Sequence, residues 1–184
     1  PVKVLNKRGS GTYTAIANGI YFAADNGAKV INMSLGGPYP SLTLENALSY
    51  AYGKGVTIVA ASGNDGASSV SYPAAYDAYV IAVGATRYDE TLAYYSNYGS
   101  ALDIVAPGGD LNVDQNGDGY GDGVLQQTFD PRTGKEGYYF YTGTSMATPH
   151  VSGVAALLYS HGASTPNEVR GLLQSTAKDL GTSG

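Results

Sequence analysis

Short apolar runs alternate with amphipathic stretches along the first half of the chain. Strands that are buried on both faces of a parallel sheet read as nearly continuous apolar segments. The apolar runs therefore predict strands at 1–5, 30–35, 56–61, 80–85 and 102–106.

The amphipathic stretches predict helices with recognisable ends. A first helix over 12–26 stops at Asn26-Gly27, and Ser41 is suited to cap a second helix that runs to Tyr52. Thr165 and the glutamate three residues later form a capping box, which starts a last helix ending near Ala177. Such alternation favours an α/β fold with three layers, a mainly parallel sheet with helices on both faces. The active crevice of such sheets lies beyond the carboxyl ends of the strands.

Composition and charge narrow the function classes. The chain has 184 residues, of which 14% are charged, a net charge of -5 and a pI near 4.8. These values indicate a single folded domain, and the acidic balance argues against nucleic-acid binding. The absence of cysteine excludes disulfides, thiolate catalysis and cysteine-ligated zinc. We find no signal peptide and no apolar run long enough to span a membrane.

Ser145 is the strongest candidate for a nucleophile. It follows Gly143 and precedes the apolar run 154–158, so it is expected at the start of a buried helix, with Thr144 as a suitable N-cap. Unpaired backbone N–H groups and the helix dipole would stabilise an oxyanion there. The alternative is that the small residues serve only close packing. His150 lies five positions further along the same helix, so its ring is expected to point away from Ser145.

Three strings together resemble the subtilisin-like serine proteases, the subtilases. Residues 143–153, Gly-Thr-Ser-Met-Ala-Thr-Pro-His-Val-Ser-Gly, resemble their nucleophile signature, and residues 60–66 resemble their oxyanion loop. The resemblance implies that Asn64 donates its side-chain amide to the tetrahedral intermediate. Without the serine motif, Asn64 could simply tolerate an unusual turn.

The third string, residues 31–37, is similar to the subtilase segment that lines the substrate cleft. Paired glycines leave backbone groups uncovered, so an extended peptide could pair with them as an added strand, although a plain strand-to-loop turn is the alternative. Walls of glycine and alanine with no charge nearby favour a large apolar or aromatic side chain. The resemblance implies this set of substrate-binding residues: Ser34, Leu35, Gly36, Gly37, Ala61, Ser62 and Gly63.

A polar insertion at about 109–138 contains a candidate calcium loop. Oxygen-bearing side chains alternate, and glycine stands at the sixth position, as in the first half of an EF-hand loop. Leu125 occupies the twelfth position, which excludes a complete EF-hand, and a metal-free acidic hairpin is the alternative. The candidate ligands are the side chains of Asp114, Asn116 and Asp118, the carbonyl of Tyr120, and Asp122 directly or through water.

The catalytic aspartate and histidine that the family resemblance implies are absent, since the chain has only His150 and His161. We therefore expect a partial catalytic domain, incomplete at both ends, with a separate N-terminal fragment supplying both groups or with the chain truncated. The resemblance implies a secreted serine endopeptidase with polypeptide substrates. The alternative is a catalytically silent, calcium-stabilised fragment that retains peptide binding.

Three remaining residues are expected to have structural roles. Asp103 is expected to be a surface hydrogen-bond acceptor, Asp25 a helix-end residue, and His161 a cap for helical carbonyls. The Tyr72–Pro73 bond could take either isomer.

Overall fold

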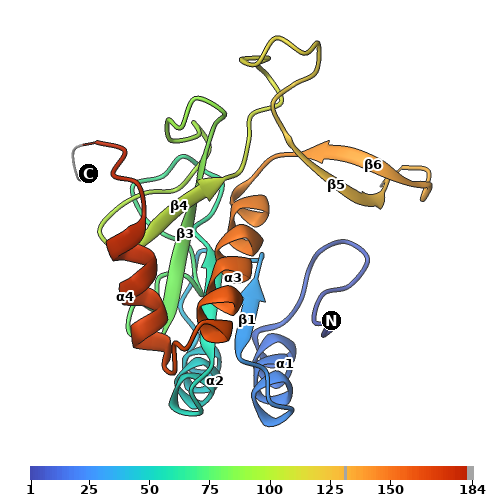
Figure 1. Ribbon diagram of the computed structural model, residues 1–184. Helices are drawn as coiled ribbons and strands as arrows, with labels where there is room; N and C mark the ends of the chain where they lie inside the picture. The colour runs from blue at the N-terminus through green and yellow to red at the C-terminus, as the bar shows by residue number, and fades with distance from the viewer. Residues whose placement is uncertain (131, 182–184) are drawn as a thin grey trace.

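The computed structural model describes residues 1–130 and 132–181. Its centre is a sheet of four parallel strands, arranged side by side in chain order (Figure 1). These are β1 (Val30–Met33), β2 (Thr57–Ala61), β3 (Val80–Thr86) and β4 (Ile104–Pro107). Every residue of β2 and β3 is buried, which explains why their sequences are almost entirely apolar.

Helices cover both faces of this sheet, as the sequence predicts. On one face, α1 (Tyr13–Asp25) and α2 (Leu42–Gly53) pack over Ile58 of β2. On the other, α3 (Thr144–Ser160) and α4 (Pro166–Thr176) pack over Val59. Adjacent residues of one strand thus point into opposite cores. The three-layer α/β fold is confirmed.

Side-chain caps define the starts of three helices. Thr12, Ser41 and Thr165 each accept a hydrogen bond from a backbone N–H in the first turn, as the sequence predicts for Ser41 and Thr165. The prediction for α3 is wrong, because its N-cap is Gly143 and Thr144 is already its first residue. Gly143 has a φ of 143°, a conformation that residues with a Cβ rarely adopt. The Thr144 hydroxyl is therefore free for another contact.

The predicted strand at 1–5 is absent. This segment pairs with no strand among the described residues and instead lies against α1. A Cβ added at Gly19 of that helix would come within 2.5 Å of Val4 Cγ1. The apolar pattern of residues 1–5 thus reflects packing on a helix and not strand pairing.

The polar insertion contains an antiparallel hairpin that the sequence analysis did not predict. Its strands are β5 (Val124–Phe129) and β6 (Glu136–Tyr141), and Val124 pairs with Tyr141 at its base. The hairpin projects from the body of the molecule directly before α3 (Figure 1).

The side chain of Asp103 is buried, contrary to expectation. Its side chain is 4% exposed, accepts a hydrogen bond from Ala82 N, and receives two from the Arg170 guanidinium. Asp103 thus ties α4 to the sheet. Asp25 ends α1 and accepts from Tyr50 and Lys54, and His161 caps α3 through its contact with the Leu157 carbonyl, both as expected. Within the described ranges, no helix combines the length and apolarity that crossing a bilayer requires.

Candidate active site

Ser145 is the second residue of α3 and lies at the carboxyl end of the sheet. Among the described residues, its backbone N–H has no hydrogen-bond acceptor. Its hydroxyl makes one long contact, 3.5 Å from Oγ to the Ser34 carbonyl oxygen, which is at the limit of a hydrogen bond. A free hydroxyl and a free amide at a helix start can attack a carbonyl carbon and hold the oxygen that becomes negative.

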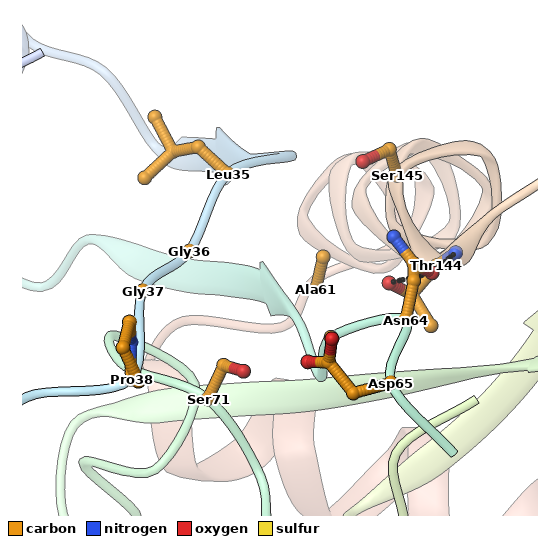
Figure 2. Close-up of a pocket in the computed structure, with 11 residues that line it drawn as sticks. Leu35, Gly36, Gly37, Pro38, Ala61, Asn64, Asp65, Ser71, Thr144 and Ser145 are labelled. Atoms are coloured by element: carbon orange, nitrogen blue, oxygen red, sulfur yellow. Dashed lines mark hydrogen bonds between the residues drawn. The ribbon is translucent and has the colours of Figure 1, made fainter. Parts of the chain in front are cut away.

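Asn64 lies in the loop after β2, next to the start of α3 (Figure 2). Its Oδ1 accepts hydrogen bonds from the Thr144 backbone N–H at 2.8 Å and from the Thr144 hydroxyl at 2.9 Å. With Oδ1 occupied in this way, the amide nitrogen is the end left to face the cavity that Asn64 shares with Ser145. Two donors, the Asn64 amide and the Ser145 N–H, therefore serve one cavity.

That cavity has a volume of about 530 Å³ and is bounded by the two predicted walls. Figure 2 shows residues 35–38 on one side, Ala61 at the back, and Ser145 and Asn64 on the other side. Of the predicted site residues, these line it: Leu35, Gly36, Gly37, Ala61, Gly63, Asn64 and Ser145.

Four further residues line the cavity that were not predicted from the sequence: Pro38, Asp65, Ser71 and Thr144. Ser71 and Asp65 both line it and lie at its lower edge in Figure 2. The expectation of a cavity without a nearby charge is therefore wrong, because Asp65 is exposed there. The place of Ser71 could not be derived from the motifs, because it lies in a loop that the fold brings back across the end of β2.

Only part of the backbone segment that is predicted to pair with a substrate peptide is free of other hydrogen bonds. Gly37 already exchanges two backbone hydrogen bonds with Tyr72, at 2.8 and 2.9 Å. Tyr72 precedes the cis peptide bond to Pro73, the isomer that the sequence left open. The backbone of Leu35 and Gly36 shows no such pairing among the described residues, so an extended peptide would pair there.

Ser62 does not line the cavity, which corrects its predicted role. Its side chain is fully buried and donates to the Asn97 carbonyl oxygen. Asn97 is itself 2% exposed, and its Oδ1 accepts from the backbone N–H groups of Asp65 at 2.9 Å and Ala67 at 3.1 Å. The Asn97 side chain thereby fixes the loop that carries Asn64. Sequence patterns gave no sign of this role.

Ser34 does not line the cavity and instead contacts the backbone carbonyl of Ser145. Because Pro149 lies inside α3 and has no N–H, the Ser145 carbonyl lacks its usual helical donor. The Ser34 hydroxyl supplies that donor at 2.8 Å. It accepts in turn from the Asn32 amide, whose oxygen accepts from Ser152. This chain of hydrogen bonds ties the end of β1 to the first turns of α3.

Further hydrogen bonds hold the backbone of Gly143, in the turn before Ser145. Its N–H is shared between the Gly108 carbonyl at 3.0 Å and the Tyr95 hydroxyl at 3.1 Å. The Tyr95 hydroxyl donates to the Gly109 carbonyl, and burial raises the pKa of Tyr95 to about 12. A neutral phenol thus anchors the turn before Ser145.

Neither histidine of the chain is placed to act as a base for Ser145. His150 contacts the Met146 carbonyl along the exposed side of α3, and His161 caps the other end of that helix. Neither one lines the cavity. Among the residues that the structure describes, the arrangement therefore offers a nucleophile and an oxyanion site without a histidine to serve as general base.

The five candidate calcium ligands lie together in the loop before β5. Asp114 accepts from the backbone N–H groups of Gly117, Asp118 and Gly119, and Asn116 contacts Asp118. Tyr120 N donates to Asp118. Among the described residues, no three acidic or histidine side chains already converge as a preformed metal centre.

Comparison with known sequences agrees with the geometry. Residues 1–184 match the model of the subtilase family. The chain is 48% identical to M-protease of Shouchella clausii (strain KSM-K16), over 98% of this chain and 43% of that protein. It is 47% identical to subtilisin Savinase of Lederbergia lenta, over 98% of this chain and 61% of that protein. The chain thus spans less than two thirds of the length of these relatives.

Solved structures show the same fold. A cold-adapted subtilisin-like serine proteinase superimposes with a TM-score of 0.79 at 34% identity, over 97% of this chain and 59% of that one. Sphericase superimposes with a TM-score of 0.77 at 34% identity, over 95% of this chain and 58% of that one.

Proposed function

Since the chain belongs to the subtilase family, we propose that it is the nucleophile-bearing part of a serine endopeptidase. The observation that supports this most directly is the shared cavity of Ser145 and Asn64, where an attacking oxygen and an oxyanion donor face one space. The substrate is a polypeptide that lies along Leu35 and Gly36.

The reaction follows from the donors and the nucleophile. Ser145 Oγ gives its proton to a base and bonds to the carbonyl carbon of the scissile peptide, whose C=O electron pair moves onto oxygen. The Asn64 amide and the Ser145 N–H hold that oxygen. Collapse of the intermediate breaks the C–N bond, and the amine leaves with the proton that the base took up. Water then repeats the sequence on the ester and releases Ser145.

The base must come from outside the residues of this chain. We propose that a histidine, oriented by an aspartate, is supplied by an N-terminal segment or companion fragment of the same enzyme. Two features support this partner. Neither histidine of the chain lines the cavity, and β1 is an edge strand whose outer side pairs with no strand among the described residues. We also propose an extracellular location, as the family resemblance implies.

A fluorophosphonate probe tests this function, because it labels only an activated hydroxyl. We expect Ser145 to be labelled slowly in the 184-residue chain and rapidly once the partner segment is added. Ser145→Ala abolishes labelling, whereas Ser160→Ala, an exposed serine at the far end of the same helix, retains it. If added partner leaves labelling at Ser145 as slow as before, the proposed origin of the base is wrong.

The second candidate function is a catalytically silent fragment that binds peptides. The observation in its favour is that no histidine lines the cavity beside Ser145 among the described residues. Peptide binding that persists in Ser145→Ala, together with no labelling in any preparation, would favour this function over the peptidase.

A further inference from the structure

The segment 109–142 leaves the sheet after β4 and returns at the start of α3, so its two ends meet beside the nucleophile. At the outgoing end, Gly108 and Gly109 both donate their backbone N–H groups to the Thr86 carbonyl oxygen, at 3.0 and 2.9 Å. This end is therefore fixed to β3, a strand whose residues are all buried. Holding the two ends of a long segment together costs conformational entropy, so the returning end needs contacts of its own.

Gly143 is the returning end, and it has no side chain that could fix its position. Its φ of 143° is a conformation that glycine adopts freely, so the surrounding contacts decide where it lies. Its N–H is shared between the Gly108 carbonyl at 3.0 Å and the Tyr95 hydroxyl at 3.1 Å. Its carbonyl accepts from Met146 N at 2.9 Å, in the first turn of α3. The contacts that hold Gly143 thereby place the turn that carries Ser145.

Tyr95 joins the two ends through one oxygen atom. Its hydroxyl accepts from Gly143 N and donates to the Gly109 carbonyl oxygen at 2.7 Å. The residue is 8% exposed and belongs to the same buried cluster as Ala147 of α3. The packing around it is tight, because a Cβ added at Gly108 would lie 2.9 Å from the Tyr95 hydroxyl oxygen and 2.8 Å from the Gly143 carbonyl oxygen. A buried hydroxyl that is bonded on both sides is a rigid link.

We propose that Tyr95 is a positioning residue for the nucleophile, which joins the two ends of this segment and so fixes the helix start that presents Ser145. Tyr95 does not line the cavity and acts through Gly143. Two residues after Gly143, the Ser145 hydroxyl attacks the substrate and the Ser145 N–H holds the oxyanion. The proposal rests on the proposed peptidase function.

A second contact holds the same turn from the side of the cavity. Asn64 Oδ1 accepts from both the N–H and the hydroxyl of Thr144. Without the Tyr95 hydroxyl, Gly143 N would keep the Gly108 carbonyl as its acceptor, so the turn would be loosened and not lost. The expected loss in rate is therefore smaller than the factor of about 10² that a misplacement of about 1 Å can cause.

Steady-state kinetics of Tyr95→Phe in the complete enzyme test the proposal, because this change removes the hydroxyl and keeps the ring. We expect kcat on a peptide substrate to fall about five- to tenfold while KM changes less than about twofold, since the substrate binds as before and only the attack is misaligned. The inhibition constant of a peptide boronic acid, which places an oxygen in the oxyanion site, should rise by about the factor by which kcat/KM falls.

The matched control is Tyr94→Phe, which removes a hydroxyl from the neighbouring residue. Tyr94 is exposed, and its hydroxyl accepts from Asn112 Nδ2 at 3.2 Å. Because Tyr94 makes no contact with Gly143 among the described residues, this variant should change kcat and the inhibition constant less than about twofold.

Hydrogen exchange in the 184-residue chain gives a second readout, which needs no activity. The amides of Met146 and Ala147 donate to the Gly143 carbonyl at 2.9 and 3.3 Å. Under native conditions they should exchange faster in Tyr95→Phe than in the parent chain or in Tyr94→Phe. A purely structural role for Tyr95 would lower stability and leave kcat of the folded enzyme unchanged.

Three results would overturn the proposal. They are a kcat in Tyr95→Phe equal to that of the parent, an equal fall in kcat in Tyr94→Phe, or unchanged exchange at Met146 and Ala147. A complete parent enzyme that cleaves no peptide refutes the proposed function instead, and the exchange rates then decide whether Tyr95 holds the turn. If Tyr95→Phe does not fold, meta-fluorotyrosine at position 95 replaces it in the test. Its fluorine weakens the hydroxyl as an acceptor, and an unchanged kcat with this residue likewise overturns the proposal.

Discussion

Asn97 holds the loop that presents the oxyanion donor, so its removal should be measurable without catalysis. In Asn97→Ala, the backbone N–H groups of Asp65 and Ala67 lose their acceptor. The contact from Asn97 Nδ2 to Ser71 Oγ is 3.4 Å long and contributes little.

The expected loss in the free energy of unfolding follows from these contacts. Two hydrogen bonds contribute about 1 kcal/mol each, or about 2 kcal/mol together. The cavity left by a side chain that is 2% exposed adds about 1 kcal/mol. We therefore expect Asn97→Ala to lower the free energy of unfolding by about 3 kcal/mol.

Urea denaturation followed by circular dichroism measures that change, and hydrogen exchange locates it. The amides of Asp65 and Ala67 should exchange faster in Asn97→Ala under native conditions, while amides in α1 keep their rates. Asn18→Ala, which removes an exposed amide from α1, is the matched control and should change stability by less than about 0.5 kcal/mol. Unchanged exchange at Asp65 and Ala67 would refute the role of Asn97.

Three further substitutions test other contacts. Asp65→Asn in the complete enzyme should lower kcat/KM for substrates with lysine at the cleavage site, relative to substrates with phenylalanine there, about fivefold. This factor corresponds to the loss of about 1 kcal/mol of attraction between two unit charges 4 Å apart in water. The same lysine-to-phenylalanine ratio in the parent and the variant would contradict this. Tyr95→Phe should cost about 2 kcal/mol near pH 8, because two hydrogen bonds are lost. Burial raises the pKa of Tyr95 to about 12, so the stability it contributes is present below pH 10 and declines as the pH rises to 12. The gap between the parent and Tyr95→Phe in urea denaturation should narrow over that range, and a constant gap would contradict the assignment. Arg170→Ala should destabilise the fold by about 3 kcal/mol, since the buried Asp103 carboxylate loses its positive partner and keeps only the neutral donors Ala82 N and Gln174 Nε2. Asp77→Ala, at a side chain 67% exposed, should change stability by less than about 0.5 kcal/mol.

Much of the fold follows from local sequence. The caps at Ser41 and Thr165 and the apolar runs of β2 and β3 each carry their signal within a few residues, and the structure has these elements where the signals indicate. The prediction of a strand at residues 1–5 was wrong because an apolar segment can pack on a helix as well as pair in a sheet. The hairpin of β5 and β6 was missed because its acidic loop dominated the composition of the insertion.

The candidate site likewise contains residues that the local sequence identifies and residues that it does not. Ser145 and Asn64 lie in contiguous motifs, so they could be identified before their meeting in space was known. Asn97 and Ser71 could not be assigned, since their roles arise only where distant loops cross the ends of β2 and β3. Ser62 was misplaced because a short motif does not show which side chain of a turn faces the cavity and which faces the core.

The shared cavity of Ser145 and Asn64 is the central claim, and a peptide boronic acid tests it most directly. Its boron bonds to a nucleophilic oxygen and places a boronate oxygen where the oxyanion would form. In a crystal structure of the complete enzyme with this inhibitor, we expect a bond from boron to Ser145 Oγ, with one boronate oxygen about 2.7–3.1 Å from Asn64 Nδ2 and from Ser145 N. A boronate attached elsewhere, or attached to Ser145 with both oxygens turned away from Asn64, would contradict the account.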